Sequence, residues 1–234
     1  MKAIILAAGK GSRLSPLTDN TPKPLLKIQD KAILDHIIDA LPDQIDEVIV
    51  VTKYLKEEIE KHIQDEFKYK HLKNIVCVNQ SEKSGTFGAL YSCKDLIQEG
   101  ERFLVLNGDD LHNKNELTQF LNFPLSAGVQ KRVMPGYYAC VQNEKGELVG
   151  FRSQNKDDEL SGVDVATGTY LLDSRIFTFE PVEINGGELG LPQTIMKNID
   201  KFPINVVVTK DWHPINTIEN LKEAEEKVKN QNNV

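Results

Sequence analysis

Cysteine, long apolar runs and excess basic charge are all scarce in this sequence of 234 residues. The three cysteines, Cys77, Cys93 and Cys140, are odd in number and far apart. We therefore expect neither a disulfide framework nor a structural zinc site, and predict a reduced, cytoplasmic chain. No apolar run approaches the roughly 20 residues of a membrane span, and the run after Met1 is shorter than a signal peptide requires. The sequence therefore predicts no export and no membrane partner.

The net charge of −7 argues against a nucleic-acid or anionic-membrane surface. The charge is unevenly distributed along the chain. Residues 1–31 carry six Lys or Arg and two Asp, a net charge of +4 that leaves −11 on the remainder. A basic segment on an acidic protein indicates a local anion-binding site.

The first half of the chain alternates continuous apolar runs with amphipathic stretches, the pattern of buried parallel strands joined by helices. The predicted strands span residues 3–6, 47–52, 74–78 and 102–106. Between them, apolar residues at helical spacing predict helices over the stretches from Ile33 to Leu41, from Leu55 to Phe67 and from Leu90 to Ile97. Such units predict right-handed crossovers and a parallel sheet with helices on both faces. Ligands of these sheets bind beyond the carboxyl ends of the strands.

From about residue 132 the pattern becomes richer in β-strands separated by polar turns. Strands are predicted at residues 133–141, 147–152, 163–172 and 205–208, and helices at 189–199 and 219–229. No linker divides the chain, so we expect one domain over residues 1–230 with halves at 1–125 and 126–230. The predicted fold is α/β, with a Rossmann-like mixed, mostly parallel sheet, helices on both faces and a smaller β-rich lobe.

A glycine-rich loop, AAGKGSR at residues 7–13, follows the first strand. Its glycines allow backbone N–H groups to approach a phosphate, and its basic side chains add positive charge. The loop lacks the spacing of the Walker A and dinucleotide-binding motifs. Ten residues later, Lys23 stands between Pro22 and Pro24, which stiffen its backbone. Lys23 is therefore a better candidate phosphate ligand than an ordinary surface lysine.

Residues 6–26, LAAGKGSRLSPLTDNTPKPLL, resemble the opening signature of the sugar-1-phosphate nucleotidylyltransferases. The resemblance extends over residues 1–228 and corresponds to the short form of this family. It implies that the loop wraps a nucleoside triphosphate and that Arg13 and Lys23 are catalytic, offsetting phosphate charge as pyrophosphate leaves. The nucleotide-binding residues that it implies are Leu6, Ala7, Ala8, Gly9, Gly11, Ser12, Gln80, Gly85 and Thr86.

Gln80 opens the segment QSEKSGT, which is similar to the turn that reads the base in this family. A glutamine amide offers both a donor and an acceptor, which suits the paired carbonyl and N–H edge of uracil, thymine or guanine. Gly85 would let the backbone approach the base. Because all three bases present compatible edges to Gln80, this turn does not choose among UTP, dTTP and GTP.

Asp109 ends the strand segment NGDD and is a natural ligand for Mg²⁺, which takes one or two protein carboxylates together with phosphate oxygens. The resemblance implies that Asp109 binds the metal, with Asp110 adjacent to it. It also implies a second metal aspartate, but Pro214 occupies that position. We therefore assign Asn216 as the second metal ligand, with Asp211 as the alternative.

Lys156, Gly168 and Glu188 are the residues that the resemblance implies for sugar-phosphate binding, in the half formed by residues 126–230. Two features depart from the family pattern. Lys156 lies in Asn-Lys-Asp in place of Glu-Lys-Pro, and Tyr137-Tyr138 replaces Tyr-Gly. A bulky side chain at the second tyrosine would reshape the sugar pocket.

The implied reaction joins an NTP to a sugar 1-phosphate with Mg²⁺, giving an NDP-sugar and pyrophosphate. A phosphate monoester is largely dianionic at neutral pH, so the reaction needs no general base and depends on positioning and preorganised charge. UTP is favoured, then dTTP or GTP. One alternative is a CTP-dependent cytidylyltransferase acting on phosphocholine or another non-sugar phosphate. Another is a non-catalytic regulatory relative that binds nucleotide. The sequence names neither the sugar nor the oligomeric state.

Overall fold

The computed structural model describes residues 1–64, 69, 71–134, 139–152, 156–184 and 186–231. The predicted helix position of Phe67, the Tyr137-Tyr138 pair and Asn155 lie outside these residues. None of the helices described is both long and apolar enough to cross a bilayer.

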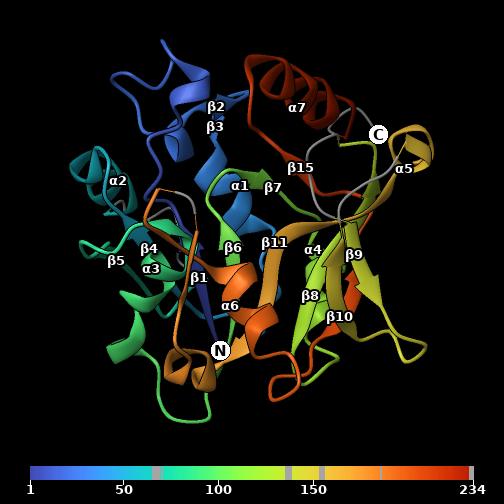
Figure 1. Cartoon of the computed structure of the whole chain (residues 1–234). Helices are drawn as coiled ribbons and strands as arrows, with labels where there is room; N and C mark the ends of the chain where they lie inside the picture. The colour runs from blue at the N-terminus through green and yellow to red at the C-terminus, as the bar shows by residue number, and fades with distance from the viewer. Residues whose placement is uncertain (65–68, 70, 135–138, 153–155, 185, 232–234) are drawn as a thin grey trace.

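In the described part of the chain, nine strands form one mixed sheet at the centre of the molecule (Figure 1). Four of them are mutually parallel, in the spatial order β6 (Arg102–Asn107), β1 (Lys2–Leu6), β4 (Glu47–Thr52) and β5 (Asn74–Asn79). These are the four predicted strands of the first half. Their carboxyl ends share one edge of the sheet, as parallel pairing requires.

The other five strands form the β-rich half. Their bounds are β8 (Ser126–Arg132), β9 (Ala139–Gln142), β10 (Leu148–Arg152), β11 (Val163–Asp173) and β14 (Asn205–Val208). β11 pairs antiparallel with β6 and joins the two halves, while β8 and β9 pair antiparallel with β11. The Leu148 N–H donates to the Ile204 carbonyl and Val206 N–H to the Gly146 carbonyl, so the start of β10 meets the start of β14.

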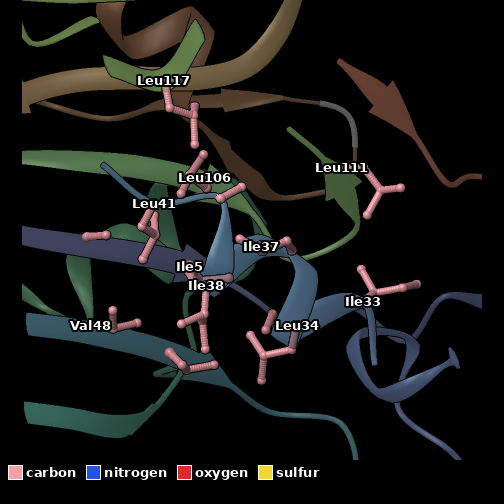
Figure 2. Packing of buried hydrophobic residues seen from close by; sticks show 14 of the residues in the cluster. Ile5, Ile33, Leu34, Ile37, Ile38, Leu41, Val48, Leu106, Leu111 and Leu117 are labelled. Atoms are coloured by element: carbon pink, nitrogen blue, oxygen red, sulfur yellow. The ribbon is translucent and has the colours of Figure 1, made fainter. Parts of the chain in front are cut away.

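Helices cover both faces of the sheet, because alternate strand residues face opposite sides. One face, which buries Ile5, carries α1 (Ile33–Asp39), α2 (Lys56–Ile63), α4 (Lys114–Phe120) and α7 (Ile218–Gln231). The apolar side of α1 packs there against Ile5, Val48 and Leu106 (Figure 2). The other face, which buries Ile4, carries α3 (Gly85–Tyr91) and α6 (Leu191–Lys197). The predicted fold class is confirmed.

Short elements surround the carboxyl edge of the sheet. They are the hairpin β2 (Lys27–Ile28) and β3 (Lys31–Ala32), the pair β7 (Asp110–Leu111) and β15 (His213–Pro214), the pair β12 (Val182–Ile184) and β13 (Glu188–Gly190), and α5 (Lys156–Ser161).

Three predicted boundaries were wrong. Of the strand predicted at residues 133–141, residues 135–138 lie outside the described part of the chain and residues 139–141 belong to β9, but residues 133–134 are not in a strand, and β8, which ends at Arg132, was not predicted. The helix expected to include Leu96 and Ile97 ends at Tyr91, and a separate 3₁₀ turn follows at Lys94–Leu96. The helix expected from Leu189 begins at Leu191, because residues 188–190 pair with β12 instead.

Candidate active site

A cleft of about 860 Å³ opens at the carboxyl edge of the parallel strands. The glycine-rich loop forms one wall, the ends of β6 and β15 form the floor, and β11 with the β13–α6 segment forms the far wall. Every residue assigned to catalysis, nucleotide binding or metal binding lines this cleft, as do Gly168 and Glu188. Two residues named from the sequence are not part of the lining: Lys156, which is exposed at the start of α5, and Asp211, the alternative metal ligand, whose carboxylate accepts a hydrogen bond from Asn113.

Two polar contacts join the N-terminal loop to the floor of the cleft. The Lys23 ammonium lies 2.5 Å from Asp109 Oδ2, and Arg13 Nη2 donates a hydrogen bond of 2.8 Å to Asn216 Oδ1. In each contact a cation predicted to bind phosphate is paired with an oxygen predicted to bind metal. Residues up to 203 positions apart in the sequence are thus brought together at one place.

Lys23 owes its position to the prolines beside it. Pro22 precedes a 3₁₀ turn that begins at Lys23, and Pro24 occupies its first turn, where a missing N–H is tolerated. The Lys23 side chain is only 8% exposed. Because a buried ammonium needs compensation for its lost hydration, the ion pair with the Asp109 carboxylate helps to hold Lys23 in this position.

Asn216 reaches the cleft through the short ladder of β7 and β15. Pro214 lies directly opposite Asp110, and the next backbone bond runs from Ile215 N–H to the Asp109 carbonyl at 3.0 Å. The missing N–H of Pro214 therefore does not break the ladder. A side chain at position 214 would face Asp110 across the ladder, so an aspartate there would place two carboxylates opposite each other.

Asp110 is buried in the floor of the cleft, with 3% of its surface exposed. Its Oδ2 accepts hydrogen bonds from Trp212 Nε1 at 3.0 Å and Asn107 Nδ2 at 3.1 Å. Burial, and secondarily the neighbouring Asp109 carboxylate, raises the pKa of Asp110 well above its usual range. The Asp109 side chain, by contrast, is 31% exposed and partly open to the cleft.

The predicted base-reading turn is built around a buried glutamine. Gln80 Nε2 donates to the carbonyls of Lys83 at 3.0 Å and Gly85 at 3.2 Å. The turn therefore uses the donor side of this amide, and Oε1 is the side-chain group left to meet a base. Gly85 has φ of 87°, and a Cβ there would lie 2.5 Å from the Leu189 carbonyl oxygen. Only glycine fits between the turn and β13.

The two sides of the cleft are fastened together next to this turn. Leu189 N–H donates to the Ser84 carbonyl at 2.9 Å, and Leu191 N–H donates to Thr86 Oγ1 at 3.0 Å. Thr86 is thus an acceptor in a structural contact as well as a lining residue. The contact carries Glu188 to the rim of the cleft, where its side chain is exposed.

Gly168 lies where β11 passes the end of β6. Its φ is 74°, and a Cβ would come within 2.1 Å of Asn107 Nδ2. The glycine therefore leaves room for the amide that bonds to Asp110. This packing role explains the residue independently of any contact with a sugar.

Several lining residues were not among the predicted site residues. Lys53 follows β4 and adds a fourth cation to the lining with Lys10, Arg13 and Lys23. Its position directly after a predicted strand is the sequence feature that could have identified Lys53 as a site residue. The wall also contains the aromatic residues Phe151, Tyr170 and Trp212, whose separation in sequence gave no such signal.

The donor atoms of the cleft suit a hard divalent cation. Asp109 and Asn216 offer oxygen atoms, and Mg²⁺ characteristically takes one or two carboxylates together with substrate phosphates. Within the described residues, no group of three or more His, Cys, Asp or Glu side chains could hold a metal ion alone. The residues present therefore fit a cation that arrives with phosphate oxygens, and do not form a cage of protein ligands.

A strand-end cleft with cations on one wall and carboxylates on its floor defines a protein that handles phosphorylated ligands on an α/β sheet. The family model described as "Nucleotidyl transferase" matches residues 2–231, and the chain belongs to this family of enzymes. Among its relatives is the UTP–glucose-1-phosphate uridylyltransferase AglF of Haloferax volcanii, 33% identical over 186 residues, which cover 76% of this chain and 74% of that protein.

The bifunctional protein GlmU of Methanocaldococcus jannaschii is 34% identical over 178 residues, covering 76% of this chain and 41% of the relative. The chain spans about half the length of the GlmU proteins that it matches. Among solved structures, a UDP-glucose pyrophosphorylase complexed with UDP-glucose has a TM-score of 0.79 at 20% identity, with 98% of each chain covered. The CTP:phosphocholine cytidylyltransferase of Streptococcus pneumoniae has a TM-score of 0.74 at 21% identity, covering 97% and 98%. These structures share the fold.

Proposed function

We propose that this enzyme transfers a nucleotidyl group from an NTP, with UTP favoured, to a sugar 1-phosphate, releasing pyrophosphate with Mg²⁺ as cofactor. The single observation that carries the proposal is the pairing of Lys23 with Asp109 and of Arg13 with Asn216 in one cleft. These four groups comprise two cations for phosphate and two oxygen donors for a metal. The AglF relative, named as a UTP–glucose-1-phosphate uridylyltransferase, supports UTP and a hexose phosphate.

The reaction needs charge placed along a line of phosphates, because both substrates are anionic. On triphosphate binding, Lys23 and Arg13 would exchange their protein partners for phosphate oxygens, which would leave Asp109 and Asn216 able to hold a divalent cation. A bound divalent cation would offset negative charge on the reacting phosphates. The attacking phosphate oxygen is already ionised at neutral pH, so no side chain has to remove a proton from it.

The acceptor is expected on the wall formed by β11, β13 and α6, where Gly168 and Glu188 lie. Lys156 is not among the lining residues, so the attacking phosphate is expected to depend on the cations of the cleft itself. Gln80 Oε1 can accept from the ring N–H of uracil, thymine or guanine and equally from the amino group of cytosine. Base selection therefore needs backbone groups of the turn in addition to Gln80.

The alternative acceptor, phosphocholine with CTP as donor, is supported by one feature of the cleft. Phe151, Tyr170 and Trp212 line it together with the Glu188 carboxylate, and aromatic faces with a nearby anion attract a quaternary ammonium. The fold likeness to the pneumococcal cytidylyltransferase does not decide the matter, because the identity is only 21%.

A matrix of pyrophosphate-release assays tests the proposal. The wild-type enzyme is incubated with Mg²⁺, one of UTP, dTTP, GTP, CTP or ATP, and glucose 1-phosphate, N-acetylglucosamine 1-phosphate or phosphocholine. Release with UTP and a sugar phosphate is expected. Release restricted to CTP with phosphocholine would establish the alternative. Nucleotide binding without release in any combination would favour the non-catalytic relative.

A further inference from the structure

The ladder of β7 and β15 carries both candidate oxygen ligands of the cleft. Asp109 directly precedes β7, and Asn216 follows β15 by two residues. A two-stranded ladder this short has little stability of its own, and Pro214 contributes no N–H to it. The relative position of Asp109 and Asn216 must therefore be held by side chains around the ladder.

The first of these side chains is Asp110. Its Oδ2 receives hydrogen bonds from Asn107, the last residue of β6, and from Trp212, the residue before β15. A buried carboxylate is costly unless donors compensate it, so both contacts are strongly favoured once Asp110 is enclosed. Asp110 thus ties the end of the central strand to the segment that leads to Asn216.

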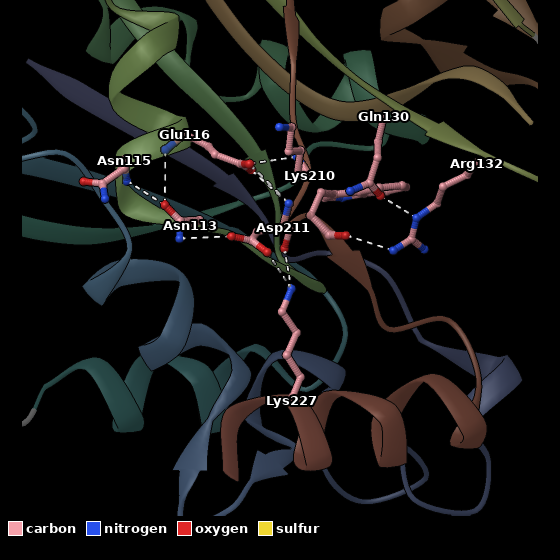
Figure 3. A network of polar contacts seen from close by, with 9 residues as sticks. Asn113, Asn115, Glu116, Gln130, Arg132, Lys210, Asp211 and Lys227 are labelled. Carbon is pink, nitrogen blue, oxygen red and sulfur yellow. Dashed lines mark hydrogen bonds and ion pairs between the residues drawn. The ribbon is translucent and has the colours of Figure 1, made fainter. Parts of the chain in front are cut away.

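The second is Arg132 at the end of β8. Its guanidinium carbon lies 5.1 Å from the centre of the Trp212 ring, and Nη2 donates to the Trp212 carbonyl at 3.0 Å. Its Nε donates to Gln130 Oε1, which holds the guanidinium plane in place (Figure 3). Arginine combines planar stacking with directed hydrogen bonds, which lysine cannot reproduce.

The residue before Trp212 is held as well. Asp211 N–H donates to the Glu116 carboxylate, and Lys227 Nζ donates to the Asp211 carbonyl at 2.9 Å (Figure 3). The indole is therefore approached by Asp110 on its N–H side and by Arg132 over its ring, while the backbone preceding it is fixed by α4 and α7.

We propose that Asp110 and Arg132 are positioning residues, which clamp Trp212 from two sides and thereby fix Asn216 and Asp109 relative to each other. The inference rests on the proposed function, because that function gives the placement of these oxygens its purpose. Both residues act on turnover through the indole of Trp212.

Trp212 is the only tryptophan in the chain, so its fluorescence reports directly on the clamp. The test compares Trp212→Phe, Asp110→Leu, Asp110→Asn and Arg132→Met by kcat, KM for the NTP, and tryptophan emission where the indole is retained. The matched control is Arg102→Met. Arg102 also donates to a main-chain carbonyl, that of Phe123 at 2.7 Å, but at the opposite end of β6 from the cleft.

Asp110→Leu and Arg132→Met should shift the emission to longer wavelength as the indole gains access to water. They should reduce kcat about tenfold to hundredfold, with KM for the NTP changed by less than about threefold. Asp110→Asn should keep the wild-type emission and most of kcat, because its amide oxygen still accepts both hydrogen bonds. Trp212→Phe should lose about tenfold in kcat, because phenylalanine keeps an aromatic ring beneath Arg132 but lacks the N–H that bonds to Asp110 and is smaller than the indole. Arg102→Met should match the wild type.

Wild-type kcat in Asp110→Leu would overturn the proposal. Lost turnover with unchanged emission would also overturn it, because Asp110 would then act on the reactants directly. Should Asp110→Leu fail to fold, Trp212→Phe decides, since full turnover in that variant is incompatible with a clamp. If the wild-type enzyme turns over no substrate pair, the proposed function has failed, and the emission of Asp110→Leu and Asp110→Asn still tests whether Asp110 holds the indole.

Discussion

Lys23 and Asp109 illustrate, at the scale of single residues, how the cleft balances its charges before substrates bind. The ammonium and a divalent cation compete for the same carboxylate, because Nζ already lies 2.5 Å from Oδ2. Lys23→Met should therefore bind Mn²⁺ about tenfold more tightly without nucleotide. The same substitution should lower turnover about a hundredfold or more, since it removes a cation from the phosphates. Electron paramagnetic resonance of free Mn²⁺ and the pyrophosphate assay measure the two effects.

Lys2 provides the matched control for this substitution. Its ammonium pairs with Glu101 at 2.8 Å and is also largely buried, but at the amino end of β1, remote from the cleft. Lys2→Met should leave both Mn²⁺ binding and turnover as in the wild type. Unchanged Mn²⁺ affinity in Lys23→Met would contradict the competition between the ammonium and the metal.

At the scale of elements, the contact between α3 and β13 depends on the absence of a side chain at Gly85. Gly85→Ala should lower the free energy of unfolding by about 3 kcal/mol or more. The new Cβ would overlap the Leu189 backbone, and alanine is also strained at the positive φ of this position. Gly100→Ala should lower the free energy of unfolding by only about 1 kcal/mol. Its φ of 75° is similar, but nothing lies within 4 Å of the added Cβ. Urea denaturation measures both, and equal losses would refute the packing argument.

The sequence predicts the parallel half of the sheet well because the central strands β1, β4 and β6 are buried on both faces and are therefore continuous apolar runs. β8 was not predicted because it contains Gly128 and the polar residues Gln130 and Lys131, which have low β propensity. The structure explains why a glycine and a glutamine occur in this strand. A Cβ at Gly128 would lie 2.4 Å from Thr167 Oγ1, and the Gln130 side chain bonds to Arg132.

The candidate site likewise contains residues that the sequence predicts and residues that it does not. Loop residues of the N-terminal signature, such as Arg13 and Lys23, are close in sequence and form one wall. Trp212 and Tyr170 join the cleft only through β15 and β11, whose positions depend on long-range pairing. Lys156 was assigned from the family resemblance, and a match along the sequence does not determine where a side chain lies; in the structure Lys156 is exposed at the start of α5 and does not line the cleft.

At the scale of the whole molecule, buried histidines make stability depend on pH. Burial lowers the pKa values of His36 and His213, and lowers that of His112 to about 3. Among the described residues, His112 Nε2 is buried without a hydrogen-bond partner. Below the unfolded pKa of about 6.5, the unfolded state therefore binds more protons than the folded state. The contribution of His112 to stability falls as the pH decreases.

His112→Gln isolates this contribution. Asp110 has the opposite effect on the pH dependence of stability, because its raised pKa makes the folded state bind a proton at a pH where the unfolded state does not. The prediction is therefore made for the difference between variant and wild type. The stability of His112→Gln relative to the wild type should increase by about 2 kcal/mol between pH 7.5 and pH 5. Urea denaturation at both pH values measures it, and parallel pH profiles would show that His112 titrates normally.

The most direct test of the central claim is a product analysis by ³¹P nuclear magnetic resonance with UTP, glucose 1-phosphate and Mg²⁺. Wild-type enzyme should form a nucleotide-sugar diphosphate and pyrophosphate in equal amounts. Asp109→Ala should form neither while retaining the circular dichroism spectrum and thermal stability of a folded chain. Equal amounts of both products from Asp109→Ala would contradict the account, as would pyrophosphate released by the wild type without a coupled product.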